Sequence, residues 1–262
     1  NRANVEEPAV VLASLGYIVV AADYVGYGAS RGTPHPYLLS APTAAAVLDL
    51  LTAAKTWRSR NSVADNGQLF LIGYSEGGYA TVAAHRALQS AGGSTLASLV
   101  ATAPGAGPYD IAVTLDELLR RVREANPLLG ALLSPGVLSG LTPIQRATVR
   151  ELLLKELLPD DADVSFDARV LDSYLADDRA AIERLGNVHD WAPAVPVRLF
   201  HGRDDQTVPY VVSTTTLQAM RARGAADVTL TDCTTVPSGH LECVPEYLSI
   251  ALADFASRAR DL

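Results

Sequence analysis

The chain has 262 residues, of which 48% are hydrophobic and 19% are charged, with 19 Gly and 15 Pro. These figures are typical of one globular domain, or of one domain that carries an insertion, and they exclude disordered and collagen-like chains. The formal net charge is −8, so there is no general basic surface for phosphate backbones. We therefore expect no nucleic-acid partner.

Two uncharged stretches are candidates for a membrane span, Pro8 to Ala22 and Ala87 to Tyr109. The first is too short to cross a bilayer as a helix, and the second is too rich in Gly, Ser and Pro. We expect no membrane span. The sequence opens on Asn1 without the basic and apolar regions of a signal peptide, so we expect a processed or trimmed chain.

Short apolar runs alternate along the chain with segments of helical patterning. The runs, each predicted as a strand, are Tyr17–Asp23, Leu69–Tyr74, Leu96–Ala103, Val197–His201 and, more weakly, Val228–Thr231. The predicted helices are Val5–Leu15, Ala41–Arg58, Gly77–Ser90, Tyr210–Arg223 and Glu246–Arg260. The first run is rich in β-branched residues, which predicts a strand buried on both faces. The alternation predicts an α/β fold whose mostly parallel sheet carries helices on both faces.

A charged segment interrupts this alternation between Ala103 and Val197. Of the 82 residues from 109 to 190, 24 are charged and 15 of these are acidic. The segment predicts amphipathic helices over Leu115–Glu124, Pro143–Leu158 and Ala168–Leu185. We expect a helical cap over residues 108–192, inserted between two parts of one core, 1–107 and 193–262. An extra subdomain without a role in catalysis is the alternative.

Residues 73–77 read G-Y-S-E-G, directly after an apolar strand and before a helical run. In that context the pattern predicts a nucleophile elbow, a sharp turn that exposes the serine hydroxyl. Ser75 is therefore the candidate nucleophile. A Gly-rich turn with an incidental serine is the alternative.

A serine hydroxyl needs a base to take its proton, and the base needs a carboxylate that fixes its tautomer. Of the five histidines, His240 lies in a loop after the last predicted strand and before the last helix, where it can reach the sheet edge. We expect His240 to be the base, and a solvent-exposed loop histidine is the alternative.

The carboxylate is expected after the strand Val197–His201, where two aspartates stand next to each other. The G-x-x-D-x-x-V-P spacing over residues 202–209 selects Asp205. Asp204 is then a turn-capping or solvent-facing neighbour.

These residues resemble the α/β-hydrolase superfamily over essentially the whole chain. The D-Y-V-G-Y-G-A-S turn at 23–30 is similar to that superfamily's D-x-x-G-x-G-x-S turn, and it joins the elbow, the aspartate turn and the late G-H pair in the family's order. More narrowly, residues 73–80, the G-P-Y-D segment at 107–110 and the H-P-Y loop at 35–37 are similar to secretory lipases and related bacterial esterases. That group carries a helical cap at this position.

The resemblance implies two backbone N–H groups that stabilise the oxyanion of the reaction. One belongs to Glu76, whose side chain also suits an ordinary residue of a first helical turn. The other comes from a loop after the family's third strand, and we expect the first three strands to be missing before Val5. Either the chain is a fragment, or another loop near Gly26 to Gly28 supplies the donor. A sheet without these strands exposes unpaired backbone.

Only two cysteines occur, Cys233 and Cys243, and they bracket His240. A disulfide between them would clamp the loop of the base and would suit an oxidising compartment, as the resemblance to secretory lipases implies. Two inert buried thiols are the alternative. Four tyrosines are candidates either for an acyl pocket or for the core: Tyr24, Tyr27, Tyr74 and Tyr79. No metal-ligand or phosphate-binding spacing occurs, so no cofactor is implied.

We therefore expect a secreted or otherwise extracytoplasmic serine hydrolase that cleaves small-molecule or lipid carboxylic esters through an acyl-enzyme. One alternative is a serine peptidase of the prolyl-oligopeptidase type, which shares the residues and their order. The other is a hydrolase-fold binding module that lacks catalysis.

Overall fold

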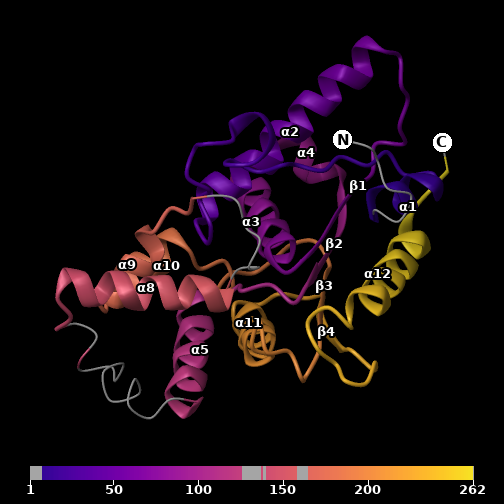
Figure 1. The fold of residues 1–262 in the computed structure, drawn as a ribbon. Coiled ribbons are helices and arrows are strands. Elements are labelled where there is room, and N and C mark those ends of the chain that lie inside the picture. Colours follow the sequence, from indigo (N-terminus) through magenta and orange to yellow (C-terminus); the bar gives the residue numbers. More distant parts are fainter. Residues whose placement is uncertain (1–7, 126–136, 138–139, 158–164, 262) are drawn as a thin grey trace.

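The computed structural model describes residues 8–125, 137, 140–157 and 165–261. Four parallel strands form one sheet in the order β1-β2-β3-β4 (Figure 1). Their bounds are β1 Leu69–Tyr74, β2 Leu99–Gly105, β3 Val197–His201 and β4 Val228–Asp232. All carboxyl ends of these strands therefore lie at one edge of the sheet, where open α/β sheets carry their sites.

Side chains of successive strand residues point to opposite faces of the sheet, as the two-residue period of a strand requires. In β3, Leu199 joins the core cluster that contains Val212 and Met220 of one flanking helix. The next residue, Phe200, packs with Tyr247 on the other face. Both faces of the strand are thus buried, which explains its continuous apolar sequence.

Helices cover both faces of the sheet, so the predicted α/β fold class is confirmed. α12 packs against one face, and α3 and α11 pack against the other, with α2 lying outside α3 (Figure 1). The helices outside the insert are α1 Pro8–Ser14, α2 Ser40–Arg60, α3 Glu76–Ala91, α4 Gly93–Ser98, α11 Val211–Ala222 and α12 Val244–Arg258, with a 3-10 turn η1 at Gly28–Ser30. Each of the five predicted helices is present, although residues 5–7 of the first lie outside the described part.

The segment between β2 and β3 is helical, as predicted. Its described helices are α5 Ile111–Ala125, α8 Pro143–Leu157, α9 Arg169–Leu175 and α10 Arg179–Leu185. The prediction of one helix over residues 168–185 is wrong, because Asp177 adopts a left-handed φ of 56° and Asp178 then caps a new helix by accepting from Ala181 N–H. Leu158, the predicted end of α8, lies outside the described residues. The division at 108 and 192 stays a prediction.

Two of the predicted strands need correction. Tyr17–Asp23 is not part of the sheet, and Ile18 and Val20 are 48% and 37% exposed rather than buried on both faces. A strand needs a hydrogen-bonded partner, and within the described residues none lies beside this run. The other strand begins at Leu99 instead of Leu96, because Leu96 belongs to the short helix α4.

None of the described helices combines the length and the apolar composition that crossing a membrane would need.

Candidate active site

Ser75 occupies the sharp turn between β1 and α3. Its backbone has φ 56° and ψ −121°, a strained conformation for a residue with a Cβ. The Ser75 N–H donates to the carbonyl of Gly105 at 2.9 Å, which ties the turn to the end of β2. The turn therefore has the backbone geometry that the G-Y-S-E-G pattern predicts for an elbow.

The glycines around Ser75 are not equivalent. A Cβ on Gly73 would collide with the carbonyl of Gly77, and a Cβ on Gly78 would collide with the carbonyl of Gly105. A Cβ on Gly77 would meet nothing within 4 Å. Close backbone approach therefore requires Gly73 and Gly78, whereas the second glycine of the pattern borders open space.

A tyrosine from α12 is hydrogen-bonded to the backbone of the elbow. The Tyr247 hydroxyl accepts from Gly73 N–H at 2.9 Å, and two carbonyl oxygens can accept its own proton, Ala103 at 2.6 Å and Gly73 at 2.8 Å. Tyr247 is 1% exposed, so these partners replace water for a buried phenol. Burial raises its pKa well above the ordinary value for tyrosine. No pattern in the sequence predicts this contact.

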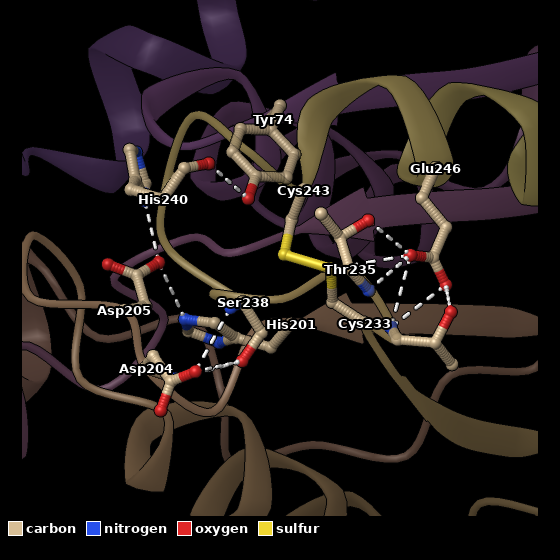
Figure 2. Close-up of a disulfide and its surroundings, with 11 residues drawn as sticks. Tyr74, His201, Asp204, Asp205, Cys233, Thr235, Ser238, His240, Cys243 and Glu246 are labelled. Carbon is tan, nitrogen blue, oxygen red and sulfur yellow. Dashed lines mark hydrogen bonds and ion pairs between the residues drawn. A yellow bond between two sulfur atoms is a disulfide. The ribbon is translucent and has the colours of Figure 1, made fainter.

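His240 lies beside Asp205 at the carboxyl edge of the sheet (Figure 2). The ring nitrogen Nδ1 is 2.6 Å from Asp205 Oδ2. This contact engages Nδ1 as the donor and leaves Nε2 as the nitrogen that can accept a proton. The other oxygen of Asp205 accepts from the backbone N–H groups of Thr207 at 2.8 Å and Val208 at 2.9 Å.

A second histidine shares the same carboxylate oxygen. His201, at the end of β3, places Nε2 3.1 Å from Asp205 Oδ2 and 3.0 Å from the Val208 carbonyl oxygen. A carbonyl oxygen only accepts, so Nε2 carries the proton and donates. Burial alone would raise the pKa of the Asp205 carboxyl, but the hydrogen bonds and charges of His201 and His240 lower it well below its ordinary range. From the sequence, His201 is predicted only as the last residue of a strand.

The loop that carries His240 is held on both flanks. The disulfide between Cys233 and Cys243 closes it, which confirms the predicted pairing. On one flank, Glu246 accepts hydrogen bonds from the backbone and the hydroxyl of both Thr234 and Thr235. Figure 2 shows this arrangement together with the histidines.

On the other flank, Asp204 fastens the loop through Ser238. Its carboxylate accepts from the Ser238 N–H at 3.0 Å and from the Ser238 hydroxyl at 2.9 Å. These bonds lower the pKa of the Asp204 carboxyl. The two adjacent aspartates thus have different partners, because Asp205 contacts His240 and Asp204 contacts the loop backbone.

Tyr74 joins the loop to the elbow. Its hydroxyl donates to the carbonyl oxygen of His240 at 2.7 Å, and the two rings lie 5.2 Å apart between centroids. Since Tyr74 directly precedes Ser75, this contact brings the His240 loop to the elbow. No hydrogen bond joins Ser75 Oγ to the His240 ring in this structure.

The other histidines lie in different environments. His85 faces Thr102 in the core, and His189 lies 3.4 Å from Asp110 at the start of the insert. His35 contacts the Glu76 carboxylate at 2.5 Å. In the described residues, no cluster of three or more His, Cys, Asp or Glu side chains is arranged to hold a metal ion.

Glu76 is the first residue of α3, and a helix leaves the N–H of its first residue without an intrahelical partner. This N–H is therefore available beside Ser75 as an oxyanion donor. In the loop near 26–28, the Gly26 N–H already donates to Ser30 Oγ at 2.9 Å and the Tyr27 N–H to the Tyr24 carbonyl at 3.3 Å. Two of the three amides considered for the second donor are thus engaged.

The insert reaches the acid turn through Arg121 of α5. Its guanidinium donates to the carbonyl oxygens of Gln206 at 2.6 Å and Asp205 at 3.3 Å. The insert therefore contacts the carboxyl edge of the sheet, where His240 and Ser75 lie.

A protein-family model identifies the family to which this fold belongs. The model of the alpha/beta hydrolase family matches residues 8–248. The chain belongs to this family. Among solved structures, this alpha/beta hydrolase is similar to LipA, a rice cell wall degrading esterase from Xanthomonas oryzae, with 25% identity and a TM-score of 0.68. The match covers 96% of this chain and 74% of LipA.

Two further solved structures share the fold of this alpha/beta hydrolase. One, described as a hydrolase from Legionella pneumophila, has 23% identity and a TM-score of 0.70, over 96% of this chain and 74% of that one. The other is lipase A of Candida antarctica in its closed state, with 18% identity and a TM-score of 0.52, over 86% and 57% of the two chains. The comparison with curated proteins finds no match.

Proposed function

We propose that this alpha/beta hydrolase is a serine hydrolase of carboxylic esters, with Ser75 as nucleophile, His240 as base and Asp205 as the orienting acid. One observation carries the proposal. The strained turn at Ser75 is joined, through the Tyr74 hydroxyl, to a loop whose histidine is bonded to a buried carboxylate. A strained serine and an oriented imidazole at one sheet edge are the requirements of nucleophilic acyl transfer.

In the proposed reaction, Ser75 Oγ attacks the ester carbonyl carbon while its proton passes to His240 Nε2. The negative charge on the carbonyl oxygen is stabilised by the Glu76 N–H. The alcohol leaves with the proton from His240, and the acyl group stays on Ser75. Water then attacks the acyl carbon, gives a proton to His240, and releases the acid when that proton returns to Ser75 Oγ.

Asp205 suits the orienting role because its charge is retained at neutral pH. The carboxylate is 1% exposed, yet it accepts from two backbone N–H groups and two imidazoles. Such a carboxylate fixes the tautomer of His240 and stabilises the imidazolium that forms during the reaction.

The substrate class is proposed from the neighbours and the insert. LipA is named as an esterase and the Candida antarctica protein as a lipase, which supports a small-molecule or lipid ester here over a peptide. We propose that the insert is a cap, because Arg121 of α5 contacts the acid turn directly. The disulfide at Cys233 and Cys243 supports an extracytoplasmic location.

The test is covalent labelling with a fluorophosphonate, followed by intact mass and by a series of acyl esters of increasing length. We expect one adduct on the parent chain and none on Ser75→Ala. Ester turnover with little cleavage of a proline-containing peptide amide would support the esterase assignment, and the reverse preference would favour the peptidase alternative. Absence of an adduct on folded parent protein would contradict catalysis and favour a binding module.

A further inference from the structure

His35 is a buried histidine beside the elbow that the proposed mechanism does not use. It is 1% exposed, and its Nε2 lies 2.5 Å from Oε1 of Glu76, the residue directly after Ser75. Its Nδ1 lies 2.7 Å from the carbonyl oxygen of Val25. Both ring nitrogens are therefore engaged, one of them with the first residue of α3.

The partners of His35 define its protonation state. The Val25 carbonyl oxygen only accepts, so Nδ1 carries a proton. The Glu76 carboxylate also accepts when ionised, so Nε2 carries a second proton and the ring is an imidazolium. Burial alone would lower the pKa of the His35 imidazole, but the bond and charge of Glu76, with the Val25 bond, raise it above its ordinary value.

The backbone of His35 is hydrogen-bonded to the insert. The His35 N–H donates to the carbonyl oxygen of Ser165 at 2.7 Å, and the Asp167 N–H donates to the carbonyl oxygen of His35 at 2.8 Å. This pairing forms a parallel bridge to Phe166. His35 therefore contacts the Glu76 side chain through its ring and residues 165–167 of the insert through its backbone.

Glu76 is the charged group bonded to the His35 ring. Four aromatic rings surround the His35 imidazole. Tyr24 and Tyr27 belong to the 23–30 turn, Tyr37 lies two residues after His35, and Phe166 belongs to the insert. Burial, followed by the negative charge of Glu76, raises the pKa of each of these tyrosines, so they stay neutral near pH 7. From the insert, Asp167 contacts His35 through its backbone N–H, and its carboxylate is paired with Arg169.

We propose that His35 is a positioning residue whose imidazolium holds the Glu76 side chain, and thereby fixes the Glu76 N–H next to Ser75 and couples it to the insert at Phe166. The inference rests on the proposed function, because it assigns the support of the oxyanion donor in that reaction. A donor displaced by about 1 Å lowers an enzymatic rate up to ~10²-fold. Loss of the Nε2 proton leaves two acceptors facing each other, so the support fails as the pH rises.

The experiment is the second-order rate constant of fluorophosphonate labelling, measured from pH 5 to pH 10 on the full chain. The parent rate is expected to fall at high pH as the His35 ring loses its Nε2 proton. His35→Asn keeps a donor for Val25 and removes the donor to Glu76. We expect it to label about 10- to 100-fold more slowly at the parent optimum, without the alkaline fall.

Two further variants separate positioning from general damage. In Glu76→Gln, the side-chain amide can donate to the neutral Nε2 of His35, so the fall in labelling rate at high pH should vanish. This variant also decides the question if His35→Asn does not fold. His85→Asn removes an equally buried histidine of α3, bonded to Thr102, and should keep the parent's fall in labelling rate at high pH.

A parent rate that stays level to pH 10, or an alkaline fall that persists in folded Glu76→Gln, would overturn the positioning role and leave the proposed function standing. The same holds if folded His35→Asn labels as fast as the parent. Absence of labelling of the parent at every pH would overturn the proposed function and the positioning role together.

Discussion

The elbow and the His240 loop meet at the same edge of the sheet, but different forces hold them in place. The elbow is fixed by close packing of backbone, where the carbonyls of Gly77 and Gly105 leave no room for a Cβ on Gly73 or Gly78. The His240 loop is fixed by side chains: a disulfide, the carboxylates of Asp204 and Glu246, and the Tyr74 hydroxyl. Close backbone packing at Gly73 and Gly78 leaves no room even for an added methyl group. The His240 loop is held by several independent bonds, so losing one of them leaves the others in place.

The largest expected change in activity comes from replacing Asp205, the carboxylate beside the His240 loop that takes part in the proposed chemistry. Asp205→Asn is expected to lower kcat for an ester substrate by ~10⁴-fold, because an amide both removes the charge and favours the wrong tautomer of His240. Asp204→Asn is the matched control, because within the described part of the chain the Asp204 carboxylate is hydrogen-bonded only to Ser238. It should lower kcat by about tenfold or less. Equal losses in the two variants would mean that Asp205 only supports the loop.

The disulfide provides a comparison of folding energies on the loop side. Replacing both Cys233 and Cys243 by serine should reduce the free energy of unfolding by about 2–3 kcal/mol, as expected for a bridge that closes a short loop. Denaturant titration would measure the change, and the parent chain after reduction should show the same loss. If the reduced parent and the double variant were both as stable as the oxidised parent, the remaining bonds would suffice to hold the loop.

Local pattern explains which parts of this site the sequence predicts. The strand–turn–helix order around Ser75 is encoded by neighbouring residues, so the elbow and the bounds of β1 follow from a short stretch of chain. The contact between Tyr247 and Gly73 joins residues 174 positions apart and has no local signal. His201, four residues before Asp205, had a usable signal, because the intervening turn brings the two side chains back together.

The failures in predicting the fold have the same origin. The run at 17–23 has the composition of a buried strand, but a strand forms only against a partner, and composition does not say whether one is present. The break at Asp177 follows from a left-handed backbone that amphipathic patterning ignores. Hydrophobic period therefore predicted the core elements well and the insert less well.

The two glycines after Glu76 test the claim that the elbow is held by packing. Gly78→Ala should destabilise the protein by about 1–3 kcal/mol, because the new Cβ meets the Gly105 carbonyl of a central strand that cannot shift. Gly77→Ala adds the same methyl group to open space and should change the free energy of unfolding by less than about 1 kcal/mol. Denaturant unfolding of both variants, beside labelling of Ser75, would measure this. Equal destabilisation by the two would contradict the packing account.

The smallest effect should come from Glu246, one of several bonds that hold the loop. Its pKa is lowered chiefly by the backbone hydrogen bond from Thr234, against a smaller effect of burial. A lowered folded pKa means that the carboxylate stabilises the protein above its unfolded pKa of ~4.3 and that this contribution is lost as the pH falls through the folded pKa. Glu246→Gln should therefore be less stable than the parent at pH 7 and equally stable near pH 2.

The size of that difference at pH 7 should be small, since the carboxylate is largely solvated and water screens its interactions. Glu242→Gln is the matched control, because Glu242 lies in the same loop and has no hydrogen-bond partner among the described residues. Its denaturant midpoint should equal the parent's at pH 7. A Glu246→Gln deficit that persisted unchanged at pH 2 would show that shape rather than charge fastens this flank, and the loop would then resemble the elbow in how it is held.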